Sequence, residues 1–293
     1  MIRALLLGSS TSKHNNKEIY MPMILVNGSQ MFYKRSGDTT KPAIIFVHGI
    51  TCDHSDWDEQ VAYFQQTHDV IAVDLNGHGQ SDVVLERCSI KSYAEDVIAL
   101  TVQLLDKPAV LVGHSMGSRV VMQAAALRPE LYSVAVLVDG SRLADPQMHD
   151  ALVAKLEATI NAVGLPAINK MVFEPMFGAD SNMPKKAQII QRAVQFPEVT
   201  GRHILKQIML WDAHHSEQTM QTLTLPVKAI QTTSQTVDGS RTFMKVGDRS
   251  SWLDFLQSKV SDIEVSILED TGHFPMQDKP TELNHLLIGM IAQ

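Results

Sequence analysis

The chain has 293 residues, of which 44% are hydrophobic and 19% charged, so it is not disordered and can bury a large core in one domain or in one domain with an insertion. Its net charge of −7 has the wrong sign for neutralising phosphates, so we expect no nucleic-acid partner. Two cysteines, Cys52 and Cys88, are too few for a disulfide framework, and we therefore expect a cytoplasmic protein.

The N-terminal residues 1–22 are predicted to form a tail outside the folded domain. Their apolar run ends at Leu7, which is too short for the hydrophobic region of a secretion signal, and polar residues follow it. No other run approaches the roughly 18 apolar residues that a membrane-spanning helix needs. We therefore expect neither a cleaved signal nor a membrane span.

Short β-branched runs alternate with helical patterns along the rest of the chain, which is typical of a βαβ sheet. The predicted strands are Ile24–Val26, Met31–Arg35, Ala43–Val47, Val70–Asp74, Ala109–Val112, Val134–Val138, Val227–Gln231 and Val265–Leu268. Two runs, AIIFVH and VAVLVD, are almost continuously apolar, as expected for parallel strands covered on both faces. The turn Asn27-Gly28 predicts a hairpin between the first two strands. The sequence therefore predicts an α/β fold whose eight-stranded sheet is mixed at one edge, parallel elsewhere and covered by helices on both faces.

Between Ser141 and Leu223 the strand pattern gives way to helical periodicity. Helices are predicted over Asp150–Val163, about Pro184–Gln195 and Glu198–His214. The first would present Leu152, Leu156, Ile160 and Val163 on one face, and the last Ile204, Ile208 and Trp211. We therefore predict a sheet domain over residues 23–141 and 223–293, with an all-helical cap over residues 142–222 inserted into it.

The strongest local signal is Gly113-His114-Ser115-Met116-Gly117, which lies between a predicted strand and a helix over Met116 to about Leu127. This strand, turn and helix are the context in which a G-x-S-x-G motif raises its serine as a nucleophile. The two glycines avoid side-chain clashes in the tight turn, and the helix N-terminus stabilises negative charge that develops beside it. Ser115 is therefore the candidate nucleophile.

Two further motifs supply the groups that a serine nucleophile needs. His48-Gly49-Ile50 ends the strand AIIFV, and we expect the backbone N–H groups of Ile50 and Met116 to form an oxyanion hole. His273, in Gly272-His273-Phe274-Pro275, follows the last predicted strand and is the candidate base. Histidine suits this role because its ordinary pKa is about 6.5.

With these motifs the chain resembles the α/β-hydrolase superfamily with a helical cap, from about Met23 to the C-terminus. The resemblance is carried by HGI at 48–50, DLNGHGQSD at 74–82, GHSMG at 113–117, VLVDG at 136–140 and GHFPMQDKP at 272–280. It implies a Ser–His–acid triad, chemistry at acyl or related carbonyl groups, and no cofactor.

The acid of the triad is the point where the chain departs from the commonest family pattern. Most members carry it a few residues after the penultimate strand, where this sequence has Gln235, with Asp238 three residues further on. A minority uses an acid at the end of the preceding core strand, and Asp139 occupies that place. Asp139 is therefore the predicted acid, with Asp238 as the alternative.

A serine nucleophile favours an acyl-enzyme on an ester, thioester, amide or lactone carbonyl. The leading prediction is a carboxylesterase for small to medium hydrophobic esters that acts as a monomer or homodimer, without a metal or cofactor. Met148, Met171, Phe173, Met176, Phe177, Met183 and Met209 of the cap are candidates for an adaptable apolar pocket. The alternatives on the same fold are a C–C bond hydrolase, a cofactor-free dioxygenase and, from another class, a non-enzymatic ligand receptor.

Other polar residues are given structural interpretations. His114, Asp74 and His78 are expected to stabilise loops around the site. The adjacent His214 and His215 point in different directions on a helix, so they do not form a chelating pair, and no cluster has the spacing of zinc ligands. Cys52 lies close to the oxyanion loop in the sequence, but nothing marks it as a nucleophile.

Overall fold

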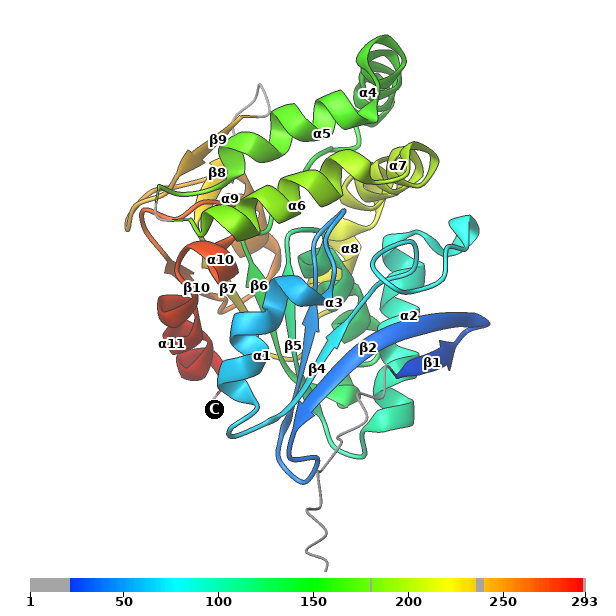
Figure 1. Ribbon diagram of the computed structural model, residues 1–293. Coiled ribbons are helices and arrows are strands. Elements are labelled where there is room, and N and C mark those ends of the chain that lie inside the picture. The colour runs from blue at the N-terminus through cyan, green and yellow to red at the C-terminus, as the bar shows by residue number, and fades with distance from the viewer. Residues whose placement is uncertain (1–21, 180, 236–239, 292–293) are drawn as a thin grey trace, which may run out of the picture.

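The computed structural model describes residues 22–179, 181–235 and 240–291, which form a central sheet with helices on both faces and a helical layer across one end (Figure 1). The eight strands lie in the order β1-β2-β4-β3-β5-β6-β7-β10. Their bounds are β1 Met23–Val26, β2 Ser29–Gly37, β3 Ala43–Val47, β4 Asp69–Val73, β5 Ala109–His114, β6 Tyr132–Val138, β7 Val227–Gln231 and β10 Glu264–Ile267. All eight predicted strands are present, to within a few residues at their ends.

The sheet is antiparallel at one edge and parallel elsewhere, as predicted. β1 pairs with β2 and β2 with β4 in antiparallel register, and the remaining pairs are parallel. The first hairpin turns at Asn27 and Gly28, whose φ values of 47° and 85° are those that a type I′ turn requires. Because β3, β5, β6 and β7 run in parallel, their carboxyl ends meet at one edge of the sheet, and the loops there can share a site.

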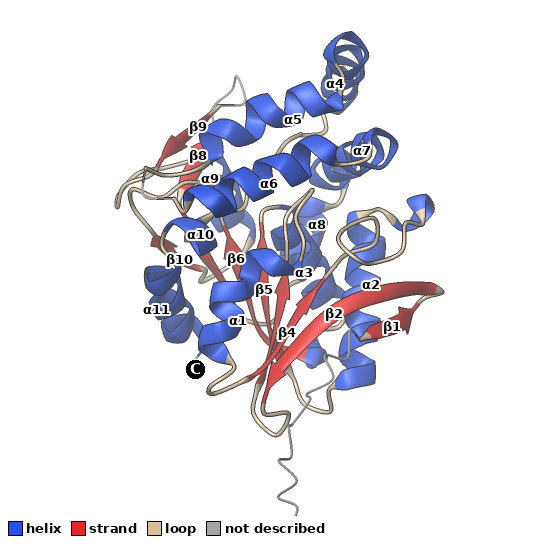
Figure 2. Cartoon of the chain, viewed as in Figure 1, coloured by secondary structure: helices blue, strands red, loops and turns tan. Residues whose placement is uncertain are grey.

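The two faces of the sheet carry separate hydrophobic cores. On one face lie α1 (Asp58–Phe64), the short α10 (Pro275–Asp278) and α11 (Pro280–Ile291) (Figure 2). On the other lie α2 (Ile90–Leu104), α3 (Met116–Leu127), α8 (Ser216–Gln221) and α9 (Ser251–Lys259). Alternate residues of β3 enter the two cores, with Ile45 and Val47 on one side and Ile44 and Phe46 on the other. This double coverage explains why the strand is apolar at every position.

Between β6 and β7 the regular elements of the described residues are all helices, most of which lie across the carboxyl ends of the strands (Figure 1). They are α4 (His149–Val163), α5 (Leu165–Phe173), the 3₁₀ turn η4 (Glu174–Met176), α6 (Met183–Gln195) and α7 (Glu198–His214), before α8 joins the core. The three predicted helices are present, whereas α5 was not predicted. Gly164 ends α4 with a φ of 78°.

One face of α4 is less buried than its periodicity suggested. Ile160 is buried and Leu152 and Leu156 are half-buried, but Val163 is exposed. The prediction that Val163 shares a buried face with Ile160 was therefore wrong: Val163 is the last residue of α4, which ends at Gly164, and its side chain is exposed. Ile204, Ile208 and Trp211 of α7 are buried as expected.

A second, two-stranded sheet follows β7. It consists of β8 (Thr233–Gln235) and β9 (Arg241–Phe243), which pair antiparallel with Gln235 opposite Arg241. Asp238, the alternative acid, lies outside the described residues, as do residues 1–21 of the predicted tail. Within the described ranges no single helix has the length and apolarity to cross a membrane. α4 combined with α5 and η4 passes that test only as a pair bent by 106°.

Candidate active site

The turn between β5 and α3 holds Ser115 in a strained backbone conformation. Its φ of 54° and ψ of −111° fall in a region that residues with a side chain rarely adopt, and such strain is typical of functional positions. A Cβ on Gly113 would lie 2.3 Å from the carbonyl oxygen of Gly117, and a Cβ on Gly117 would lie 2.3 Å from that of Val47. Both glycines are therefore required by close backbone contacts, as the motif predicts.

The loop after β3 lies directly beside this turn. A Cβ on Gly49 would be 3.3 Å from the Cβ of Ser115, and Thr51 has a φ of 60°. His48 is buried below the loop, where its Nδ1 donates to the carbonyl of Gly49 (2.7 Å) and its Nε2 accepts from the Leu75 N–H (3.0 Å). Burial lowers the pKa of His48, so the neutral ring holds the loop in place. Ile50 and Met116, the candidate oxyanion donors, line the same cavity as Ser115.

His273 is buried in the loop after β10 and lines the same cavity as Ser115. Its backbone N–H donates to the Met176 carbonyl at 2.6 Å, and its own carbonyl accepts from Nε2 of His114 at 2.7 Å. The Nδ1 atom donates to Oδ2 of Asp139 at 2.5 Å. Burial and the positive charge of Arg241 lower the pKa of His273 to about 4, although Asp139 raises it. The imidazole is therefore neutral near pH 7, which is the state a general base requires.

Asp139 follows β6 with a φ of 43° and is completely buried. Its Oδ1 accepts the backbone N–H groups of Thr232 and Thr233 at 2.8 Å each, and its Oδ2 accepts the Thr233 hydroxyl at 2.6 Å in addition to His273. Burial alone would raise the pKa of this carboxyl, but the hydrogen bond and charge of His273, with Arg241 and Thr233, hold the pKa well below its usual range. The structure thus brings Asp139 to His273, as predicted.

A cavity of about 220 Å³ opens above Ser115. Its floor comes from the strand ends and comprises Gly49, Ile50, Thr51, Ser115, Met116 and His273. Its roof comes from α4, α5 and α7 and includes Leu156, Ile168, Val172, Phe173, Leu205 and Ile208. The floor carries the polar groups of Thr51, Ser115 and His273, and the roof is largely apolar, so the cavity can hold a small molecule with one reactive polar group and an apolar remainder.

The predicted pocket residues are only partly in this cavity. Phe173 and Met176 line it. Met148, Met171 and Met183 are instead exposed at the surface, Met209 lies outside the lining, and Phe177 stacks on Phe274 with ring centroids 4.7 Å apart. The prediction for these five residues was wrong, because helical periodicity gives the apolar face of a helix but not the neighbour against which that face packs.

Two arginines that were not predicted also line the cavity. Arg119, one helical turn after Ser115, is buried and forms a two-bond ion pair with Asp212 of α7 at 2.8 and 2.7 Å. It also donates to the carbonyls of Ser115 and Ser141. Arg241 of β9 donates to the Thr233 hydroxyl at 2.9 Å and lies 3.5 Å from Oδ2 of Asp139. Arg119 follows Ser115 by four residues, and on a helix this spacing could have indicated that its side chain lies beside the serine. No sequence pattern indicates that Arg241 lies at the cavity.

Besides the Arg119–Asp212 pair, two sets of contacts tie the inserted helical segment to the loops of the floor. Arg192 of α6 donates to the carbonyl of Thr51 (3.0 Å) and pairs with Asp53 and Asp56 at 2.6 and 2.5 Å. At the other side of the cavity, Oδ2 of Asp278 accepts the N–H groups of both Gly178 and Gly272 at 2.8 Å. These contacts connect the helical segment to the oxyanion loop and to the histidine loop respectively.

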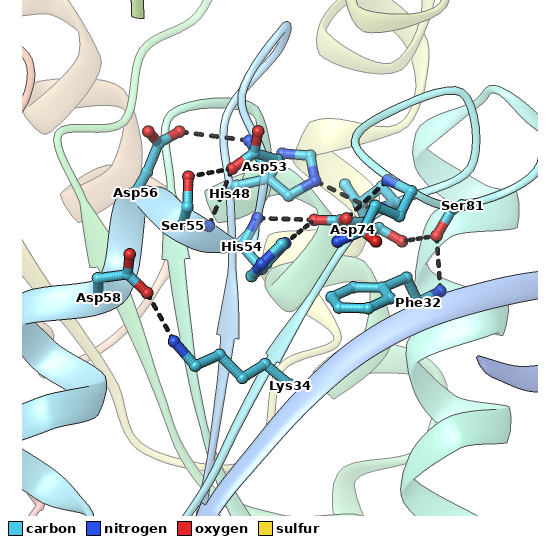
Figure 3. Close-up of polar contacts among 12 residues, drawn as sticks. Phe32, Lys34, His48, Asp53, His54, Ser55, Asp56, Asp58, Asp74 and Ser81 are labelled. Carbon is cyan, nitrogen blue, oxygen red and sulfur yellow. Dashed lines mark hydrogen bonds and ion pairs between the residues drawn. The ribbon is translucent and has the colours of Figure 1, made fainter. Parts of the chain in front are cut away.

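Asp53, His54 and Asp74 form a cluster beside the oxyanion loop, and their ligand atoms lie within 4.8 Å of one another (Figure 3). Each group already has hydrogen-bond partners. Asp74 accepts from His54 N–H and Nδ1 through Oδ1, and from the Gln80 N–H through Oδ2, while Asp53 accepts from Ser55 and Arg192. The cluster therefore supports the loop, which is the role predicted for Asp74.

Comparison with known proteins identifies the family and the fold. The model of the α/β hydrolase family matches residues 44–286, so the chain belongs to that family. A 2-(acetamidomethylene)succinate hydrolase of Mesorhizobium japonicum is 34% identical over 117 residues, which are 40% of this chain and 42% of that protein. A putative esterase/lipase of Haemophilus influenzae is 32% identical over 38% of each chain. The crystal structure of an enol-lactonase from Burkholderia xenovorans superposes with a TM-score of 0.74 and 20% identity over 93% of this chain and all of that one, which shows the shared fold.

Proposed function

We propose that the protein is a serine hydrolase that cleaves carboxylic esters of small to medium hydrophobic substrates. The observation that carries this proposal is the placement of Ser115, on its strained turn, in one cavity with His273, whose Nδ1 is bound to buried Asp139. Neither a fixed turn nor a buried His–Asp pair is needed for ligand binding alone. The relatives named above, a hydrolase and a putative esterase/lipase, support the same reaction class.

The mechanism assigns one role to each group. Nε2 of neutral His273 takes the proton of Ser115 while Oγ attacks the carbonyl carbon, and the imidazolium that forms is stabilised by Asp139. The developing oxyanion accepts the N–H groups of Ile50 and Met116. Collapse of the adduct expels the alcohol, which takes the proton from His273. Water then attacks the acyl-enzyme in the same way and releases the acid and free Ser115.

The shape of the cavity sets the expected substrate size. At about 220 Å³ it is smaller than the roughly 300–1,000 Å³ of pockets for drug-sized ligands. We propose that the helices of the inserted segment act as a cap that closes this space from above. Acetyl and butyryl esters should therefore be better substrates than lauroyl esters.

The test is hydrolysis of p-nitrophenyl esters from acetate to laurate by the wild type and by Ser115→Ala. We expect turnover to fall to background in the variant, and a fluorophosphonate probe to label the wild type but not the variant. If folded wild-type protein turns over no ester and is not labelled, the esterase proposal is wrong, and the C–C hydrolase and dioxygenase alternatives become the ones to test.

A further inference from the structure

The charges around the cavity are unequal. Two guanidinium groups, those of Arg119 and Arg241, lie among the described residues that line it, and no aspartate or glutamate does so. The carboxylates that pair with these arginines, Asp212 and Asp139, are both buried outside the lining. A substrate in the cavity therefore meets the cationic side of each pair.

The two guanidinium groups differ in how fully they are bonded. Arg119 uses Nε, Nη1 and Nη2 in hydrogen bonds to Asp212, Ser115 and Ser141. Arg241 has a side chain that is only 8% exposed, yet its buried Nε has no hydrogen-bond partner among the residues that the structure describes. A buried N–H group without a partner is costly and rare, and at the wall of a ligand cavity it indicates a site for an acceptor that the ligand supplies.

Asp139 does not need Arg241 to complete its hydrogen bonds. Its oxygens already accept from two backbone N–H groups, the Thr233 hydroxyl and His273, and the contact with Arg241 is long, at 3.5 Å. The neighbour of Arg241 across the hairpin is Gln235, which also lines the cavity. An amide and a guanidinium side by side are suited to bind a carboxylate, because the guanidinium offers two parallel donors to its oxygens.

From this arrangement we propose that Arg241 binds an anionic group of the substrate, so that the preferred esters carry a carboxylate. This inference rests on the proposed ester hydrolysis and specifies its substrate class. The carboxylate would occupy the β8–β9 side of the cavity, and the ester carbonyl would lie above Ser115. Arg241 is then a specificity-determining residue rather than only a support for Asp139.

The test compares anionic esters with neutral esters of the same shape. Methyl hydrogen succinate and methyl levulinate form one pair, with the charge on the acyl side. Acetoxyacetate and acetoxyacetone form the other, with the charge on the alcohol side. For at least one pair we expect the wild type to prefer the anion by 10-fold or more in kcat/KM. Arg241→Met should reduce that ratio to one or below, and Arg241→Lys should give an intermediate ratio.

Matched controls separate this role from a loss of structure. Arg249→Met removes an exposed arginine from the same segment of the chain and should leave both the activities and their ratio unchanged. If Arg241→Met lowers turnover of the anionic and neutral esters by the same factor, Arg241 serves only to position Asp139 and the proposal is wrong. The absence of any preference for the anion in the wild type would overturn it equally.

Binding to an inactive protein distinguishes this proposal from the esterase proposal. Isothermal titration of Ser115→Ala with the same ester pairs should show tighter binding of the anion, and the preference should be lost in Ser115→Ala/Arg241→Met. Anion-selective binding without turnover by the wild type would retain the carboxylate site and reject the esterase. Turnover of the neutral esters without anion selectivity would retain the esterase proposal and reject the carboxylate site.

Discussion

The floor and the roof of the cavity are built in different ways. On the floor, Thr51 and Ser115 have positive φ angles, and glycines 113 and 117 are required by close backbone contacts. The roof consists of regular helices that present apolar side chains such as Leu156, Val172 and Ile208. The backbone therefore fixes the reactive groups, whereas side chains determine what fits above them. Substitutions should accordingly affect catalysis when they are on the floor and selectivity when they are on the roof.

The largest expected effect is that of Asp139→Asn. The amide cannot stabilise the imidazolium of His273 and favours the wrong tautomer, so kcat should fall by about 10⁴-fold with the fold retained. Asp238→Asn is the matched control and should retain most of the activity. Both are checked by ester turnover together with circular dichroism. If Asp238→Asn is the inactive variant, the assignment of the acid is wrong.

The next effect concerns the ion pair that joins α3 to α7. Arg119→Met leaves the carboxylate of Asp212 buried without its partner, so the free energy of unfolding should fall by about 3–5 kcal/mol. The exposed pair of Arg249 with Asp254 should contribute less than about 1 kcal/mol. Urea denaturation of Arg119→Met and Arg249→Met measures both. Equal losses in the two variants would show that the buried pair does not connect the roof to the core.

The pH dependence tests the environment of His273. Since the pKa of folded His273 is about 4 and its neutral form is active, the acidic limb of kcat/KM should have its midpoint near pH 4. At pH values between about 4 and 6.5, His273 is protonated in the unfolded state but neutral in the folded state. Because the unfolded state binds the extra proton, the contribution of His273 makes the free energy of unfolding fall as the pH drops through this range. Arg241→Met should move the midpoint of this acidic limb to higher pH, because the positive charge of Arg241 lowers the pKa of His273. A wild-type midpoint at 6.5 would contradict the inference.

The smallest effect is expected on the roof. Val172→Ala enlarges the cavity by two methyl groups and should shift the ratio of kcat/KM for longer over shorter acyl chains by about 10-fold. Val163→Ala makes the same change at an exposed site outside the lining and should not alter this ratio. A series of p-nitrophenyl esters measures both variants. If this ratio shifts in the Val163 variant but not in the Val172 variant, the acyl group does not bind beside Val172.

The same comparison explains what could be predicted from the sequence. Residues of the floor follow from short motifs, since only a few local sequences allow the strained turn at Ser115, and the strand order then places His273 and Asp139. Arg241 was missed because β8 and β9 have three residues each, too few for a recognisable alternation. The roof was predicted as helical, but Met148, Met171 and Met209 were wrongly assigned to the pocket. The direction of a helix face depends on contacts that are distant in the sequence, and local periodicity does not encode them.

The contact between Gly117 and the carbonyl oxygen of Val47 has a consequence for how this protein can change. It joins the start of α3 to the end of β3 through main-chain atoms, so this close approach of the serine turn to the end of β3 is possible only while residue 117 is a glycine. Mutations of the roof residues that do not contact this loop, such as Val172 and Ile208, can therefore accumulate without altering that contact. New substrate preferences can be selected, in nature or in a directed-evolution experiment, from variants that keep the serine turn in its place.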